Sequence, residues 1–272
     1  MSEKKRFVSV LFLIVLVVLA ASPKGVMSEL FKESDGGPKI SILYDNYVYT
    51  DGTKADWGFS CLITGMDKTI LFDAGTRSDI LWHNIKTLGV EMESIDLIVI
   101  SHNHGDHTGG LFSVLDTVKQ VPVYIPSSFP EGFFEKVKEK GSRAVRVSEP
   151  VEICDGIFST GEMGISIKEQ SLVMQTEQGG VLITGCAHPG IVKIVEKAAQ
   201  IVEDKVYFAL GGFHLMQKSD DQVDQIINRF HELGVLMCGA THCTGDRAIR
   251  LFEQAFGDHY VTMGVGRVVK IQ

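Results

Sequence analysis

A short apolar run that leads into a cluster of histidines constrains the fold of this chain more than any other feature. The run covers residues 97–100, and residues 101–110 after it read Ser-His-Asn-His-Gly-Asp-His-Thr-Gly-Gly. A short, wholly apolar run is typical of a strand that is buried on both faces. We therefore expect the histidines to follow the end of a central strand, where the glycine-rich loop folds them together.

The spacing of the polar residues in this cluster indicates a metal site. His102 and His104 are two residues apart, so their side chains point to the same side of an extended segment. Asp106 and His107 follow Gly105, where the chain can turn and present them to a second ion. Imidazole nitrogens with a carboxylate oxygen suit Zn²⁺ best, with Mn or Fe as alternatives. We expect zinc, with two ions per chain.

Three later histidines occur in a similar context. Each follows an apolar run that predicts a strand and lies next to a turn of small residues; they are His188, His214 and His242. Ligands of open α/β folds gather where strands end and loops begin. We therefore expect these side chains to join the first cluster. The other histidines are interpreted as structural: His83, His231 and His259.

Strand and helix signals alternate along the rest of the chain. The first expected strands cover residues 39–48, 59–63 and 69–72. Helical spacing of apolar residues predicts helices over 79–88, 191–202 and 220–233. Ser219 and Gln222 have the spacing of a capping box for the last of these helices. No break in composition divides residues 39–272, so we expect one α/β domain of two packed sheets flanked by helices.

The N-terminus has the features of a leader. Basic residues at 4–6 precede an apolar run over 7–21, in which Ser9 is the single polar residue. A helix of that length spans about 22 Å, less than the roughly 30 Å of a bilayer core. We predict a signal peptide or N-terminal anchor over 1–28 and a domain over 29–272. The chain is then exported (secreted or periplasmic) or anchored to a membrane through this segment alone.

Composition argues against several other classes of protein. A hydrophobic share of 44% and a charged share of 22% are typical of a packed globular chain and exclude a disordered one. The net charge is −8, whereas proteins that bind nucleic acid usually present a basic surface. We therefore expect a small-molecule substrate and no nucleic-acid partner.

Several residues near the expected site have more than one interpretation. Cys186 and Cys243, close to two of the later histidines, fit small buried residues, redox-sensitive thiols, additional soft ligands or a disulfide pair. Residues 45–47, Asp-Asn-Tyr, fit either a turn or contacts that support ligands or substrate. Trp57 and Phe59 fit either a pocket wall or, as the preferred interpretation, the core.

At these residues the chain resembles the metallo-β-lactamase superfamily. The resemblance rests on the His-x-His-x-Asp-His run at 102–107, on His188 and His242, and on Asp73. Asp73 matches the early strand-end aspartate whose hydrogen bonds support the histidine loop in that superfamily. The resemblance covers roughly residues 39–265. It implies a four-layer αβ/βα sandwich with the metal site at the edge of the two sheets.

The resemblance also implies a set of metal ligands. The first metal would be held by His102, His104 and His188, and the second by Asp106, His107 and His242. Many relatives with two metals carry a bridging aspartate after a later strand, where residues 211–214 of this chain read Gly-Gly-Phe-His. His214 is then either a replacement ligand or a proton donor to the substrate, and we expect weaker binding of the second metal.

Three phrases narrow the resemblance to one subgroup. Residues 185–192, 210–215 and 241–245 resemble the subgroup named after 7,8-dihydropterin-6-yl-methyl-4-(β-D-ribofuranosyl)aminobenzene 5′-phosphate synthase. The superfamily implies a zinc-dependent hydrolase that attacks an ester, lactone or phosphoester with water activated by the metal. Asp106 would orient that water, and His214 would protonate the leaving group. The alternatives are a pterin-related synthase and a non-catalytic, metal-dependent binding protein.

Overall fold

The structure is a computed structural model that describes residues 37–272. The predicted signal peptide or anchor over 1–28 lies outside the described residues, and so does the beginning of the predicted domain. Between residues 37 and 272, no helix is both long enough and apolar enough to cross a membrane.

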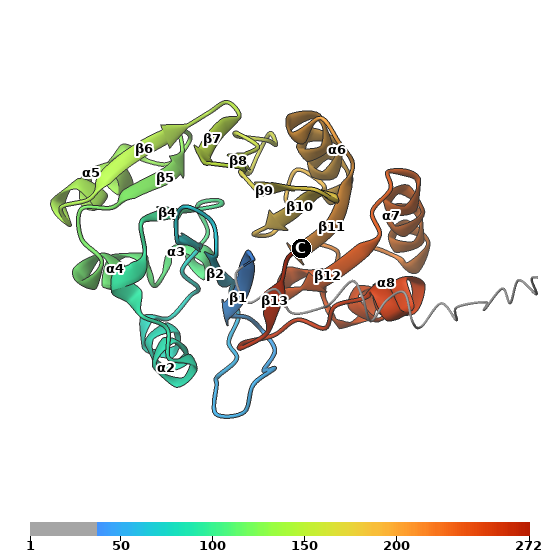
Figure 1. Cartoon of the computed structure of the whole chain (residues 1–272), viewed down its shortest axis with the longest axis horizontal. Helices are drawn as coiled ribbons and strands as arrows, with labels where there is room; N and C mark the ends of the chain where they lie inside the picture. Colours follow the sequence, from blue (N-terminus) through green and yellow to red (C-terminus); the bar gives the residue numbers. More distant parts are fainter. Residues whose placement is uncertain (1–36) are drawn as a thin grey trace, which may run out of the picture. The chain divides into compact units, whose positions relative to one another are not determined.

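The first sheet has seven strands in the order β13-β1-β2-β3-β4-β5-β6 (Figure 1). Their bounds are β1 (Lys39–Tyr44), β2 (Ser60–Thr64), β3 (Ile70–Phe72), β4 (Leu97–Val99), β5 (Pro122–Pro126), β6 (Arg143–Val147) and β13 (Val268–Lys270). The pairs around β1 and β2 are antiparallel, whereas β3, β4, β5 and β6 run parallel. The carboxyl ends of β3 and β4, where Asp73 and the histidine cluster follow, therefore lie at the same edge of the sheet.

The second sheet has six strands in the order β12-β11-β10-β9-β8-β7. Their bounds are β7 (Val151–Cys154), β8 (Ile157–Ser159), β9 (Leu172–Thr176), β10 (Gly179–Thr184), β11 (Val206–Gly212) and β12 (Met237–Thr241). Strands β7 to β10 form an antiparallel meander, and β10, β11 and β12 are parallel. Each of these three parallel strands is followed closely by one of the later histidines of the predicted site.

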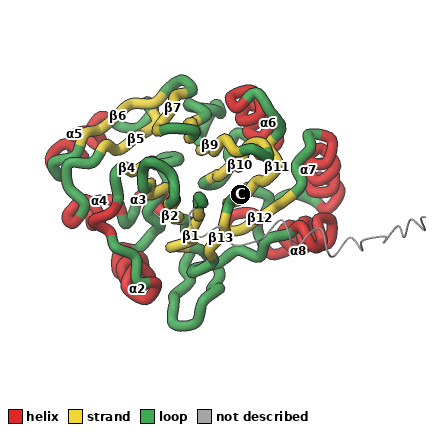
Figure 2. Tube along the Cα trace, viewed as in Figure 1, coloured by secondary structure: helices red, strands yellow, loops and turns green. Residues whose placement is uncertain are grey.

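Helices cover the outer face of each sheet (Figures 1 and 2). Their bounds are α2 (Ser78–Leu88), α3 (Gly105–Thr108), α4 (Leu111–Thr117), α5 (Glu131–Glu139), α6 (Ile191–Val202), α7 (Asp220–Glu232) and α8 (Asp246–Phe256), with 3-10 turns η1 (Met92–Ser94), η2 (His242–Thr244) and η3 (Gly257–His259). Apolar side chains of α2, α4 and α5 pack on the first sheet, and those of α6, α7 and α8 pack on the second.

A third apolar cluster fills the space between the two sheets. It joins Phe72 and Val99 of the first sheet to Ile183 and Leu210 of the second. Leu71, next to Phe72, instead packs against the helices, because successive side chains of a strand point to opposite faces. The order helix, sheet, sheet, helix confirms the predicted four-layer αβ/βα sandwich, and the two buried faces explain the wholly apolar strands.

Most predicted elements are present, with differences near the site. The helix over 191–202 has the predicted bounds, and the capping box of Ser219 and Gln222 is formed. The first strand ends at Tyr44 instead of residue 48, because a register shift beside β2 directs the next residues out of the sheet. The glycine-rich loop contains a short helix, α3, that the sequence analysis did not predict.

Candidate metal centre

Five segments that follow parallel strands meet at one edge of the two sheets. They follow β3, β4, β10, β11 and β12, and they carry all of the site residues predicted from the sequence. A continuous series of ring contacts connects the segments after β4, β10, β11 and β12, with centroids 4.2–5.2 Å apart: His104, His102, His188 and His214 on one side, and His102, His107 and His242 on the other. Asp73, after β3, joins them through its hydrogen bond with His107. The three histidines interpreted as structural are not among these contacts.

Three groups of potential metal ligands are formed among the described residues: one joins Cys186, His214 and Cys243, and the other two contain the histidines predicted as ligands. These two are called the ligand groups. In the first, donor atoms of His102, Cys186 and His188 all lie within 4.8 Å of one another. In the second, donor atoms of Asp106, His107, Cys186 and His242 do so. His104 lies beside the first group, where its Nδ1 is 3.0 Å from His102 Nε2. The predicted ligands are thus brought together as expected, and Cys186 is an addition to both groups.

Two ring nitrogens in these groups are unpartnered, which fits a metal. His188 Nε2 and His242 Nε2 are buried and make no hydrogen bond, and His242 Nε2 lies 3.4 Å from Asp106 Oδ2 of the same group. A buried polar atom without a partner is unfavourable unless another ligand satisfies it. Because one such nitrogen belongs to each group, the donor set suits two ions. The superfamily resemblance and this geometry therefore agree on where metal would bind.

Side chains behind the ligands hold the rings in the orientation that metal binding requires. His107 Nδ1 donates to Asp73 Oδ2 at 2.7 Å, and His242 Nδ1 donates to Asn46 Oδ1 at 2.9 Å. His102 Nδ1 lies 2.9 Å from the hydroxyl of Ser101, which itself donates to Asp73. With Nδ1 engaged in each ring, Nε2 faces the cluster as the metal donor. The supporting role expected of Asp73 is confirmed.

Glu169 is a functional residue that the sequence analysis missed. Its buried carboxylate accepts hydrogen bonds from the backbone N–H groups of Cys186, Ala187 and His188, at 2.8–2.9 Å. Burial raises the pKa of Glu169 to about 7, although the three N–H groups oppose that rise. The sequence around Glu169 gives no local signal of this role, because the backbone N–H groups that it binds lie in the turn that follows β10.

Trp57 and residues 45–46 support the second group. The Trp57 indole is 46% exposed, donates to Asp106 Oδ2 at 2.9 Å and packs against the ring of His242. The preferred interpretation of Trp57 as a core residue is therefore wrong, whereas Phe59 is fully buried in the core. Asp45 accepts from the Thr241 hydroxyl, so the 45–46 segment supports the turn that carries His242.

Residues 58–198 match the family model described as the metallo-beta-lactamase superfamily. The chain belongs to the metallo-β-lactamase superfamily. Members of this superfamily are generally enzymes and typically bind metal ions. The four-layer fold and the edge position of the ligand groups are those that the resemblance implied.

Relatives of known sequence or structure support this membership. The chain is 30% identical to 7,8-dihydropterin-6-methyl-4-(beta-D-ribofuranosyl)-aminobenzene-5'-phosphate synthase of Methanocaldococcus jannaschii, over 85% of this chain and 96% of the relative. It is 27% identical to Tm1679, a solved metal-dependent hydrolase of the beta-lactamase superfamily, with a TM-score of 0.72 over 86% of this chain and 99% of the other. Human tRNase Z, short form, shares the fold at 14% identity, with a TM-score of 0.59 over 86% and 99% of the two chains.

The side chains of this superfamily site have unusual proton affinities. Burial opposes the charged form of His107, but the Asp73 carboxylate outweighs it and raises the pKa of His107 to about 9. Burial, with the nearby His214 and His104 rings, lowers the pKa of His188 to about 4. Burial would raise the pKa of Asp106, yet His242 and His107 hold that pKa well below its ordinary range. Asp106 and His188 are thus already in the states that bind metal.

Backbone strain is concentrated at the same place. Within residues 37–272, six non-glycine residues have a positive φ, and four of them carry or adjoin the site: Asp73, Ala187, His214 and His242. A non-glycine residue in this region of φ is uncommon, and such strain persists where the surrounding structure enforces it. Each of these four residues follows a parallel strand, so the strain turns the chain sharply toward the centre.

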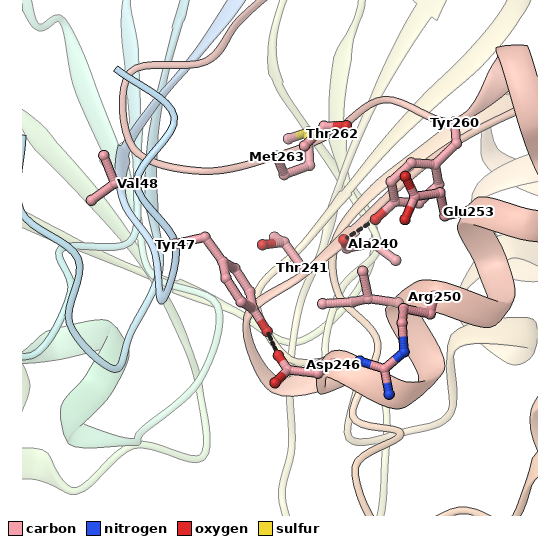
Figure 3. Close-up of a pocket in the computed structure, with 11 residues that line it drawn as sticks. Tyr47, Val48, Ala240, Thr241, Asp246, Arg250, Glu253, Tyr260, Thr262 and Met263 are labelled. Atoms are coloured by element: carbon pink, nitrogen blue, oxygen red, sulfur yellow. Dashed lines mark hydrogen bonds between the residues drawn. The ribbon is translucent and has the colours of Figure 1, made fainter. Parts of the chain in front are cut away.

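A separate pocket lies beside the turn that carries His242. Its volume is about 370 Å³, and its wall includes Thr241, Arg250 and Glu253. In Figure 3, Tyr47 donates to Asp246 across one side of this pocket, and Tyr260 donates to the carbonyl of Ala240 on another. None of the residues in the two ligand groups lines it. The pocket is therefore next to the metal centre without being part of it.

Proposed function

We propose that this chain is a zinc-dependent hydrolase of small molecules with two ions in its centre. The observation that carries the proposal is the pair of ligand groups, each with a buried and unpartnered imidazole nitrogen. The proposed ligands of the first ion are His102, His104 and His188. The proposed ligands of the second ion are Asp106, His107 and His242.

The chemistry of the donors favours zinc. Imidazole and thiol donors suit Zn²⁺, whereas manganese prefers sites built mainly from oxygen. Zinc bound here would act as a Lewis acid and would make water acidic enough to provide a nucleophile near neutral pH. Membership of the superfamily and the likeness to Tm1679, a metal-dependent hydrolase, support hydrolysis as the reaction.

Asp106 and His214 have the positions needed for two proton-handling roles. Asp106 is partly exposed, and the Trp57 indole fixes the orientation of its carboxylate, which then orients the attacking water. His214 is exposed beside the ring of His188, and a hydrogen bond with Cys243 raises its pKa. A histidine whose pKa is raised holds its proton to a higher pH than an ordinary imidazole, which suits it to protonate a leaving group. The proposed substrate is an ester, lactone or phosphoester.

Metal content and turnover test this function together. The purified chain should hold about two zinc ions, and it should hydrolyse at least one member of a panel of esters, lactones and phosphoesters. Asp106→Ala should lower kcat/KM by more than about 100-fold, because even the partners of metal ligands are worth 10–100-fold. The matched control is Asp224→Ala, an exposed aspartate of α7. Full turnover by Asp106→Ala would exclude the assigned role.

A synthase reaction is the second candidate, and it rests on one observation. The relative from Methanocaldococcus jannaschii, 30% identical over most of both chains, is named as a pterin-related synthase. A synthase would form a bond between an activated pterin precursor and the nitrogen of an aminobenzene derivative, with loss of the leaving group of the pterin and one proton of the amine. Product analysis by mass spectrometry distinguishes the two, since a hydrolase splits its substrate with addition of water and a synthase yields a joined product that has lost the leaving group. A chain that binds zinc and does neither would be a binding protein.

A further inference from the structure

One sulfur atom belongs to both ligand groups of the centre. Cys186 Sγ lies within 4.8 Å of the donor atoms of His102 and His188, and also of those of Asp106, His107 and His242. Its distance to His107 Nε2 is 3.2 Å. No other residue described between 37 and 272 is shared by these two groups. The thiol is therefore placed between the two proposed ion positions.

The carboxylates around the centre are engaged elsewhere. Asp73 accepts three hydrogen bonds, two from Ser101 and one from His107. Glu169 uses both oxygens to hold the backbone of residues 186–188. Asp106 belongs to the second group alone. Among the described residues, no carboxylate belongs to both ligand groups, whereas the Cys186 thiol does.

The position of the thiol is built into the turn that carries it. Glu169 fixes the backbone on both sides of the Cys186 side chain, and Ala187 adopts a φ of 62° to bring His188 to the same centre. Gly185 packs so closely that a Cβ there would lie 2.3 Å from the Ser101 hydroxyl oxygen. The thiol itself is buried, at 3% exposure of the residue. Because Cys186 is buried and its backbone is held by Glu169, the thiol is fixed at this place in the centre.

We propose that the Cys186 thiolate bridges the two metal ions, in the role that an aspartate after a later strand has in many relatives. This inference rests on the proposed two-metal function and adds the ligand that joins the ions. When the ions bind, the thiol releases its proton to solvent and each ion gains one bond to sulfur, with no change of oxidation state. Thiolate is a soft ligand, so the bridge favours zinc over manganese or magnesium.

Cys243 provides the internal control for this assignment. It is also buried, and its thiol donates to the backbone oxygen of Cys186 at 3.5 Å. The donor atom of Cys243 lies within 4.8 Å of those of Cys186 and His214, but Cys243 belongs to neither of the two ligand groups that define the proposed ion positions. All five cysteines are free, so the two thiols are not consumed in a disulfide. The inference therefore predicts different results for the two cysteines.

X-ray absorption at the zinc edge measures the bridge directly. With two zinc ions per chain, a bridging thiolate gives about one sulfur neighbour per zinc at about 2.3 Å, whereas a terminal thiolate gives about half of that. Cys186→Ser should remove the sulfur signal, and Cys243→Ser should keep it. Cys186→Asp should restore two bound ions without sulfur, because a carboxylate also bridges. Cobalt substitution should show a thiolate-to-metal charge-transfer band that follows the same pattern.

The possible outcomes distinguish failure of this inference from failure of the proposed function. Two zinc ions with only nitrogen and oxygen neighbours would overturn the bridge and leave the hydrolase proposal standing. Half a sulfur neighbour per zinc would make the thiolate terminal and would also overturn the bridge. A sulfur signal that survives in Cys186→Ser would assign the ligand to Cys243 instead. A chain that retains no zinc would overturn both proposals. The measurement on the unaltered chain stands even if a variant does not fold.

Discussion

The two sheets contribute to the metal centre in different ways. The first sheet supplies four of the proposed ligands from one six-residue stretch, 102–107, and Asp73 supports it from the neighbouring strand. The second sheet supplies single residues at the ends of three strands, each on its own turn. Residues far away in sequence support these turns: Glu169 holds the turn of His188, and Asn46 holds His242. The compact motif is thus supported by one aspartate on the neighbouring strand, whereas the scattered residues need a different supporting residue for each turn.

The largest effect is expected from Asp73→Ala, which removes the carboxylate that supports the histidine stretch 102–107. The change leaves His107 and Ser101 without their buried partner. Breaking a buried charge pair from one side costs about 3–5 kcal/mol. The free energy of unfolding in urea should fall by that amount, and zinc content should fall at both ion positions. Asp73→Asn, which keeps the shape, should lose less stability; equal losses would contradict an electrostatic role for Asp73.

A smaller effect is expected from variants of the two residues that support turns of the second sheet, and these variants should differ in which ion they weaken. Glu169→Gln replaces one acceptor oxygen by an amide and disturbs the turn of Cys186 and His188. Asn46→Ala frees the ring of His242 and the backbone N–H of Gly58, and it leaves the turn of Cys186 and His188 intact. Loss of such partners lowers metal affinity by about 10–100-fold. Chelator competition should show Asn46→Ala weakening one ion and Glu169→Gln weakening both, because the turn carries the bridge.

Exposed residues of the same types serve as controls for these variants. Glu177→Gln and Asn103→Ala change side chains that are exposed to solvent. Both should retain the zinc affinity of the unaltered chain. If Glu169→Gln matches Glu177→Gln in metal binding, the turn of Cys186 and His188 does not need the Glu169 carboxylate. The proposed difference between the supports of the two sheets would then be wrong.

Stability of the chelator-treated chain should depend on pH in opposite directions in the two regions. The pKa of His107 is raised to about 9, so its contribution is present below pH 6.5 and is lost as the pH rises toward 9. The pKa of His188 is lowered to about 4, so its contribution is present above pH 6.5 and is lost as the pH falls toward 4. Urea midpoints across this range should fall at both ends. His107→Gln should flatten the alkaline side only.

The smallest effect is expected far from the centre, at the capping box of α7. Ser219→Ala removes the hydroxyl that accepts the Gln222 backbone N–H. Loss of such a cap costs about 1 kcal/mol. The urea midpoint should decrease slightly while zinc content is unchanged. A loss of zinc in this variant would mean that the centre responds to general destabilisation, which would weaken the interpretation of the other variants.

The sequence predicted the parts of this molecule whose causes are local. The His-x-His-x-Asp-His stretch, the apolar strands and the helix over 191–202 all depend on neighbours within a few residues. The role of Asp73, whose partners are 28 and 34 residues away, was predicted from the family resemblance, whereas the roles of Glu169 and Trp57 were not predicted because no local pattern marks them. The shared position of Cys186 required the fold as well, since only the meeting of the two sheets places its thiol between two sets of histidines.

The burial of the ligands has a consequence for how ions enter and leave. His102, His107 and His242 are fully buried, whereas His104, Asp106 and His188 are partly exposed and His214 is exposed. An ion arriving from solvent meets the exposed donors first and exchanges its water molecules for protein ligands one at a time. Departure in the reverse order would break the bonds to the buried donors first and the bonds to the exposed donors last. The centre should therefore exchange its metal slowly, and small chelators should remove ions faster than bulky ones of equal affinity.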